Sequence, residues 1–313
     1  MTIQYLETIL KNVSTCDAWS LQIIKVTHSK RNGSSYSTRE VEISPKGRLK
    51  EHVEELAKKY LSDNQSGKQG ELKQYTDCRE YDGSADVKVI YKLSKSSELI
   101  TNEYGLLLQA IANPDTEIQP LELKYQASVI KGDLLIDDDT ISVKFVSMQN
   151  PITTLKNKFL QSNGTFKEIS NKVLTLRNSI DLVIVNDIVY LLNLSGEKLF
   201  NMERAYHSIC DSKIQLIEVK SIIEGFDSFK ESASSGHNPR KFVSFNDDHL
   251  EKLADKKSRK KIAKKFNIPL KNDKFDSTQD GVADKIVKLL CQKGMLDPFD
   301  DIPMEVSGSR KWI

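Results

Sequence analysis

The chain has 313 residues, of which 38% are hydrophobic and 29% are charged, and its formal net charge at pH 7 is +2. It is long enough for two or three packed units of ordinary domain size and should fold without disulfide bonds or structural metal. Its most apolar stretch, residues 180–194, contains Asn186 and Asp187 and falls short of the roughly twenty apolar residues of a membrane span, so we do not expect the chain to cross a membrane.

The N-terminal third alternates strand and helix patterns. Its first residues lack the basic and apolar segments of a signal peptide, and the four cysteines are far apart in sequence, which together favour a reducing cytoplasm. Short apolar runs predict strands, and apolar residues at helical spacing predict helices. The strands are expected over residues 19–28, 38–44 and 85–93, and the helices over residues 47–63 and 96–113. We therefore predict an α/β region over residues 1–113.

Residues 114–195 change to an antiparallel pattern. Two strand-like runs occupy residues 117–147 and are joined by a polar segment. Residues 181–194 place two apolar runs on either side of Asn186-Asp187, as in a β-hairpin. The acidic run at residues 136–140 is typical of a strand-linking turn rather than of a cation site. We therefore predict a central antiparallel sheet.

The rest of the chain is predicted to be helical. Helices are expected over about 196–231, 246–265 and 279–293, so we assign a helical region to residues 196–296 and a tail to residues 297–313. The predicted fold class is α+β, with an N-terminal α/β region, a central antiparallel sheet with the hairpin 181–194, and a helical C-terminal region.

A run of basic residues within the segment 254–266 is the clearest candidate for a binding surface. Its members are Lys256, Lys257, Arg259, Lys260, Lys261, Lys264 and Lys265. No acidic residue occurs between Lys256 and Lys271, so the charges lack i,i+4 partners along the helix. A polyanion such as DNA would relieve this repulsion and would gain affinity from released counterions. The alternatives are a solvated helix face and a surface for an acidic protein or a lipid headgroup.

The apolar residues around this run predict a break in the helix. At about 100° per residue, Leu250 and Leu253 point in one direction, whereas Ile262 and Phe266 point elsewhere. Two short helices or a kink near Lys257 would satisfy both pairs. The segment 259–269 also resembles the first helix and turn of a helix-turn-helix, but the next predicted helix begins with acid, so we do not expect base-specific reading.

An enzymatic alternative is a Mg²⁺-dependent nuclease with a D…(D/E)-x-K motif. Such a site needs two carboxylates for the metal and a nearby lysine. The most suggestive triplets begin at Asp86, on a predicted strand, and at Glu218, downstream of Asp211. The triplet occurs six times in this acid-rich and lysine-rich chain, so it carries little information alone. Cysteine and histidine spacing predicts no metal site, and no other motif predicts a catalytic residue or a cofactor.

The residues 178–200, NSIDLVIVNDIVYLLNLSGEKLF, carry a resemblance to a known family. The order of Asp181, an apolar strand, the Asn186-Asp187 turn, a second strand up to Asn193, and then Phe200 resembles the central signature of the KwaB-like family. That family is the cytosolic component of the bacterial Kiwa anti-phage defence system. The segment 242–266 also fits the resemblance, which is strongest over about 170–293.

The resemblance implies a DNA-binding subunit that acts with a multi-pass membrane protein, KwaA-like, and blocks phage DNA replication or expression. It further implies a cytoplasmic protein recruited to the inner membrane by that partner, and we expect a homodimer. The tail, residues 297–313, is a candidate for the partner contact. The seven basic residues are our predicted DNA contacts, and no catalytic residue is implied. A nuclease and a scaffold that binds only protein remain as alternatives.

Overall fold

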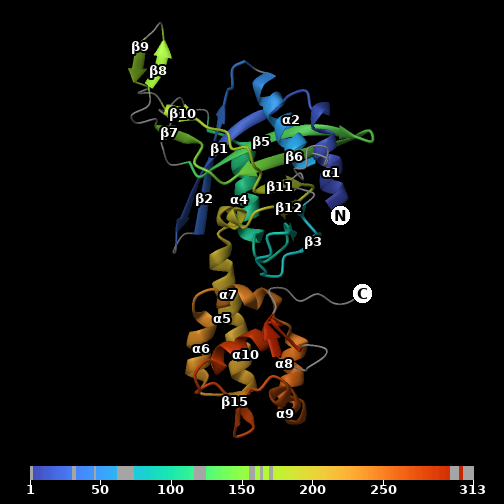
Figure 1. The fold of residues 1–313 in the computed structure, drawn as a ribbon, viewed down its shortest axis with the longest axis vertical. Helices are drawn as coiled ribbons and strands as arrows, with labels where there is room; N and C mark the ends of the chain where they lie inside the picture. Colours follow the sequence, from blue (N-terminus) through green and yellow to red (C-terminus); the bar gives the residue numbers. More distant parts are fainter. Residues whose placement is uncertain are drawn as a thin grey trace. The chain divides into compact units, whose positions relative to one another are not determined.

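The computed structural model describes residues 3–29, 33–45, 47–61, 74–115, 125–154, 159–162, 165–168, 172–296 and 303–305. The chain divides into two compact units (Figure 1). The first unit comprises Met1–Glu80 and Val87–Asn201, and the second comprises Tyr81–Asp86 and Met202–Ile313. The tail 297–313 lies outside the described residues apart from 303–305. The α+β fold class predicted from the sequence is confirmed.

Within the described residues, the first unit is built on an eight-stranded sheet in the order β2-β1-β5-β6-β11-β12-β4-β3. Neighbouring strands are antiparallel except β3 and β4, which are parallel. The strands are β1 (Ser20–Ser29), β2 (Gly33–Val41), β3 (Asp77–Glu80), β4 (Val89–Ser94), β5 (Ala127–Ile136), β6 (Asp139–Ser147), β11 (Leu182–Val185) and β12 (Ile188–Leu191).

The predicted hairpin at 181–194 is confirmed as β11 and β12. Its two-residue turn, Asn186-Asp187, has φ angles of 49° and 62°, the left-handed values that this kind of turn requires and that Asn and Asp tolerate. The acidic segment 136–140 likewise contains the turn between β5 and β6, which is formed by Asp137 and Asp138 at positive φ.

Helices cover both faces of this sheet. Leu21 of β1 lies in the core formed with α1 (Ile3–Lys11) and α2 (Gly47–Leu61). Its neighbour Gln22 instead donates to the carbonyl of Ile111, at the end of α4 (Thr101–Ala112), over 3.0 Å. Because adjacent strand residues point to opposite sides, α4 lies on the face opposite α1 and α2. Burial of both faces explains the continuous apolar runs of the central strands.

Shorter elements complete the first unit. These are the single-turn helix η1 (Val13–Thr15), the 3-10 helix η3 (Leu194–Phe200), and the strand pairs β7 (Ile152–Thr154) with β10 (Lys172–Leu174) and β8 (Phe159–Ser162) with β9 (Thr165–Glu168). The helix predicted over 196–231 is therefore not continuous. It is interrupted at Asn201, where φ is 49°, and again after Ser221, where φ is 50°.

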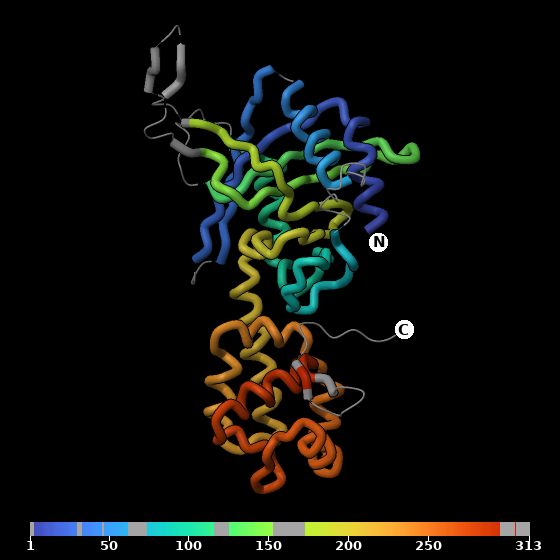
Figure 2. The backbone as a smooth tube through the Cα atoms, in the orientation of Figure 1, coloured from blue at the N-terminus to red at the C-terminus, as the bar shows by residue number. Residues whose placement is uncertain are grey.

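The second unit is mainly helical, as predicted (Figure 2, yellow to red). Its helices are α5 (Met202–Lys220), α6 (Phe226–Ser234), α7 (Asn238–Lys241), η4 (Phe242–Ser244), α8 (Asp247–Ala254), α9 (Lys256–Lys265) and α10 (Val282–Leu290). Its strands are β13 (Ile223–Glu224), β14 (Leu270–Lys271) and β15 (Lys274–Asp276), in the order β13-β15-β14, and the pair β16 (Gly294–Leu296) with β17 (Pro303–Glu305). Phe229, Phe242 and Phe275 are fully buried in its core.

The segment 81–86 is fixed within the second unit by polar contacts. Arg240 Nη2 donates to the carbonyl of Ser84 over 3.0 Å, and Lys293 Nζ lies 3.1 Å from Ser84 Oγ. Gly83 has a φ of 76°, and a Cβ there would stand 2.3 Å from the Arg240 carbonyl oxygen, so only glycine fits. None of the helices in the described part of the chain combines the length and apolar character needed to span a bilayer.

Candidate nucleic-acid interface

The basic run lies on α9, a helix separate from α8. Asp255 ends α8 and caps the N-terminus of α9, with an extended backbone and its Oδ2 accepting from the Ser258 amide over 2.7 Å. Leu250 and Leu253 of α8 are buried, as is Ala263 of α9. The break predicted from the two apolar directions is thus confirmed, and it falls at Asp255.

The C-terminal end of α9 turns the chain back along the helix. Asn267 adopts a left-handed conformation, with φ of 51°, and the Ile268 amide donates to the Ala263 carbonyl over 2.9 Å. This is a Schellman motif, which satisfies the last carbonyls of the helix. The chain then forms the hairpin of β14 and β15 through a two-residue turn, Asn272-Asp273, with φ angles of 52° and 58°. The turn brings Asp273 against the first turns of α9.

Arg259 is held inside the second unit. The residue is 8% exposed. Its Nη1 donates to the carbonyls of Leu253 over 2.7 Å and Ala254 over 3.2 Å, and its Nε donates to the carbonyl of Asp273 over 2.8 Å. The first two acceptors are at the end of α8, where carbonyls have no partner within their own helix. The structure therefore gives Arg259 an anchoring role, unlike its lysine neighbours, and we leave it out of the proposed contact set.

The other six predicted contact residues are exposed and share one side of α9. We call them the lysine face: Lys256, Lys257, Lys260, Lys261, Lys264 and Lys265. At 100° per residue they spread over about half of the helix circumference, and the buried residues Arg259 and Ala263 lie on the other half. Two lysines, Lys264 and Lys265, also complement the negative end of the helix dipole.

Asp273 neutralises part of the lysine face. Its carboxylate forms ion pairs with Lys256 and with Lys260, the latter at 2.6 Å. Hydrogen bonds from these two ammonium groups lower the pKa of Asp273 to about 2. We expected the repulsion between the lysine charges of this run to have no compensating acid. This expectation is wrong for Lys256 and Lys260, because Asp273, in a turn beyond Lys271, supplies the acid. The remaining four lysines of the face form no ion pair with any residue that the structure describes.

The fold does not support the other sites considered from the sequence. The hairpin of β14 and β15 separates α9 from α10, so these helices do not form a helix-turn-helix. Asp86 precedes β4, which begins at Val89, so it does not lie on a strand as predicted. Glu218 is exposed on α5, and Lys220 pairs with Glu251 at 2.7 Å. In the described ranges no three His, Cys, Asp or Glu side chains gather as a metal site would require.

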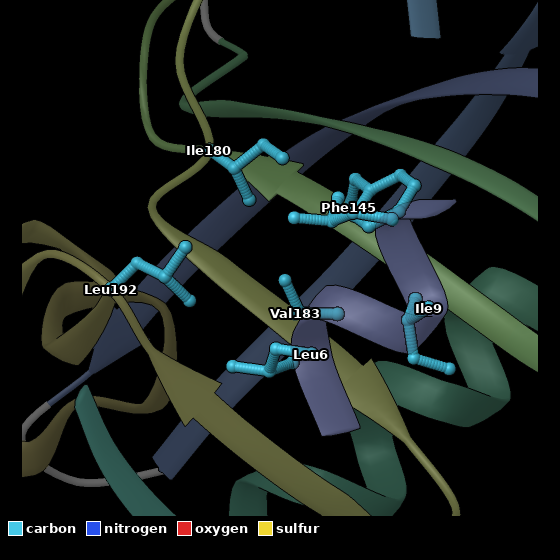
Figure 3. Close-up of a pocket in the computed structure, with 7 residues that line it drawn as sticks. Leu6, Ile9, Phe145, Ile180, Val183 and Leu192 are labelled. Carbon is cyan, nitrogen blue, oxygen red and sulfur yellow. The ribbon is translucent and has the colours of Figure 1, made fainter. Parts of the chain in front are cut away.

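A small apolar pocket lies in the first unit beneath α1 (Figure 3). It is lined by Leu6, Ile9, Leu10, Phe145, Ile180, Val183 and Leu192. Specific ligand sites combine apolar walls with a few polar groups that orient the ligand, and these lining side chains offer none. The pocket is therefore best described as a gap in core packing.

Asp181 joins several segments of the first unit. It is 1% exposed, and its carboxylate accepts from the Met148 amide and from Ser195 Oγ, each at 2.6 Å, and from Arg177 Nη1 at 3.2 Å. The Leu192 amide also donates to the Asp181 carbonyl over 2.9 Å. The residue that begins the hairpin signature is thus a structural junction, a role that the sequence order alone did not reveal.

Comparison with known proteins identifies one family. The family model described as "Kiwa protein KwaB-like" matches residues 134–294, which is half of the chain. No curated protein and no solved structure matches the chain. The matched segment contains Asp181, the β11–β12 hairpin, the whole of α9 and Asp273.

Proposed function

The chain belongs to the KwaB-like family of Kiwa anti-phage defence proteins, and we propose that in this system it binds DNA without reading its sequence. In this proposal the lysine face of α9 contacts the phosphate backbone. A membrane protein of the KwaA type is the second partner and recruits the protein to the inner membrane. Binding of the phage DNA, by a homodimer, then blocks its replication or expression.

The observation that carries the proposal is the set of four exposed lysines on α9 for which the described part of the chain offers no ion-pair partner. Lys257, Lys261, Lys264 and Lys265 are exposed and extend over about 12 Å along the helix axis, at 1.5 Å per residue. Ammonium groups in these positions can each contact a phosphate and release a condensed counterion from the DNA. This gives an affinity that does not depend on the DNA sequence. The exposed side chains of α9 include no Asn, Gln or Arg, whose planar amide and guanidinium groups pair with base edges through two hydrogen bonds. The chemistry therefore favours backbone binding.

The test is binding of the full chain to duplex DNA of random sequence across a salt series. The test variant carries Lys257→Glu and Lys261→Glu, which lie one turn apart on the lysine face. The matched control carries Lys230→Glu and Lys285→Glu, two exposed lysines of α6 and α10 in the same unit, and has the same net charge. We expect the slope of log K against log salt to flatten by about 1.8 in the test variant, for two lost phosphate contacts, and to change little in the control.

Two results would contradict the proposal. Equal losses in the test and control variants would mean that only net charge matters and that no particular face binds. Absence of salt-sensitive DNA binding by the unmodified chain would leave the lysine face as a solvated surface and would favour a scaffold that binds only protein. Divalent-dependent cutting of the DNA in the same assay would instead favour the nuclease alternative.

A further inference from the structure

We infer that Asp273 is an internal competitor for phosphate: its carboxylate occupies Lys256 and Lys260 and cancels one of the six positive charges that the lysine face could present to DNA. The inference rests on the proposed DNA binding and adds to it a residue that sets its strength. It predicts that the affinity of the natural chain lies below what its lysine face could provide.

The contact is built by three residues in the first two turns of α9. Lys256 and Lys260 bind the carboxylate of Asp273, while Arg259, which lies between them, binds its backbone carbonyl over 2.8 Å. The side chains of Lys256 and Lys260 are still 62% and 53% exposed. They are therefore accessible to an external anion but already hold an internal one.

The position of Asp273 does not depend on the two lysines. The β14–β15 hairpin places it, with Lys271 opposite Lys274 in register, and Arg259 fixes its carbonyl from inside the fold. Lys274 Nζ also lies 2.9 Å from Ser221 Oγ, which ties the hairpin to the end of α5. The fixed backbone of Asp273 consequently keeps its carboxylate within reach of the helix. A phosphate must displace it from each ammonium group.

The chemistry of the competition is that of one anion replacing another. A carboxylate oxygen and a phosphate oxygen are both strong acceptors for an ammonium donor. The single carboxylate cancels one of the two ammonium charges, so Lys256 and Lys260 together would release about one condensed counterion fewer from the DNA than two free lysines would. Removal of the Asp273 charge should free both ammonium groups and restore the cancelled positive charge.

The experiment measures random-sequence duplex binding by the full chain over the same salt series, with Asp273→Asn as the test variant. Asparagine tolerates the positive φ of 58° at this position and retains the carbonyl that Arg259 binds, so the fold should persist. Asp280→Asn, at an exposed position of the same unit, is the control for net charge. A third variant combines Asp273→Asn with Lys256→Gln and Lys260→Gln.

We expect Asp273→Asn to steepen the salt slope from about −4.5 towards −5.4, because the net charge of the lysine face and Asp273 together rises by one, and to tighten binding at 0.1 M salt by about tenfold. Asp280→Asn should leave both quantities near those of the natural chain, and the combined variant should lose the gain. If Asp273→Asn binds no more tightly than Asp280→Asn while Lys257→Glu/Lys261→Glu weakens binding, this inference is wrong and the proposed function stands. If no variant binds DNA, both are wrong.

Discussion

Arg259 and Asp273 are joined by a hydrogen bond of 2.8 Å from the guanidinium Nε to the backbone carbonyl oxygen. The same guanidinium donates to the carbonyls of Leu253 and Ala254, so one buried side chain connects the end of α8, the body of α9 and the β14–β15 turn. Arg259 is not part of the lysine face, but it fixes the geometry of that face.

Replacing Arg259 should destabilise the fold. It should not remove a phosphate contact, as replacement of a lysine on the lysine face would. Arg259→Ala leaves three carbonyls without their charged donor, and we expect the free energy of unfolding to fall by about 2–3 kcal/mol. Arg259→Lys should be nearly as damaging, because one ammonium group cannot reproduce the planar fork. Urea denaturation followed by circular dichroism measures the change.

Lys261→Ala, on the exposed side of the same helix, is the control and should alter the free energy of unfolding by less than about 0.5 kcal/mol. An Arg259→Ala variant as stable as the natural chain, with DNA affinity reduced as in a lysine variant, would return Arg259 to the set of DNA contacts predicted from the sequence.

The contrast between Arg259 and its neighbours shows what the sequence could and could not reveal. Helical periodicity places Arg259 one turn from Ala263, on the buried side, so its inward position was available from the pattern. The ion pairs of Asp273 could not be predicted from the pattern. Asn272-Asp273 is a recognisable hairpin turn, but its contact with α9 depends on how the hairpin packs, which no local pattern encodes.

The same distinction applies to the sheet. The two apolar runs on either side of Asn186-Asp187 correctly predicted the β11–β12 hairpin, because both strands and the turn are local. The pairing of β12 with β4, in which Ser94 lies opposite Ile188, joins segments almost a hundred residues apart. As a result, strands from the N-terminal region and from the central region share one sheet, which the strand patterns alone did not indicate.

The low pKa of Asp273 predicts how its effect depends on pH. Its folded pKa of about 2 lies below its ordinary value of 3.8, so its ion pairs contribute stability that is complete above about pH 4 and is lost as the pH falls through 2. Between pH 5 and 8 the carboxyl stays ionised. The ratio of DNA affinities between Asp273→Asn and the natural chain should therefore be constant over that range.

A ¹³C NMR titration of the Asp273 carboxyl measures this pKa directly. The Lys256→Gln/Lys260→Gln variant should raise it towards the ordinary value, because both charged ammonium donors are removed. An unchanged midpoint in that variant, or a midpoint near 3.8 in the natural chain, would show that the two lysines do not hold the carboxylate in solution.

Asp181 should be among the most sensitive positions of the first unit. Asp181→Ala removes a buried carboxylate and leaves the Met148 amide and the Ser195 hydroxyl without their acceptor, while Arg177, whose side chain is 38% exposed, can turn to water. We expect the free energy of unfolding to fall by about 3 kcal/mol or more. Ser195→Ala should cost about 1 kcal/mol, since it removes a single hydrogen bond.

The two substitutions combined should cost less than their sum, because the hydroxyl has no acceptor to lose once Asp181 is absent. Asp133→Ala, at an exposed position of β5, is the matched control and should be within about 0.5 kcal/mol of the natural chain. Urea denaturation of the natural chain, the two single variants and the combined variant forms the cycle. Strict additivity would mean that the 2.6 Å contact between Asp181 and Ser195 contributes nothing in solution, whereas a positive coupling would explain why this aspartate opens the hairpin signature: it binds the segments on both sides of β11 and β12 to each other.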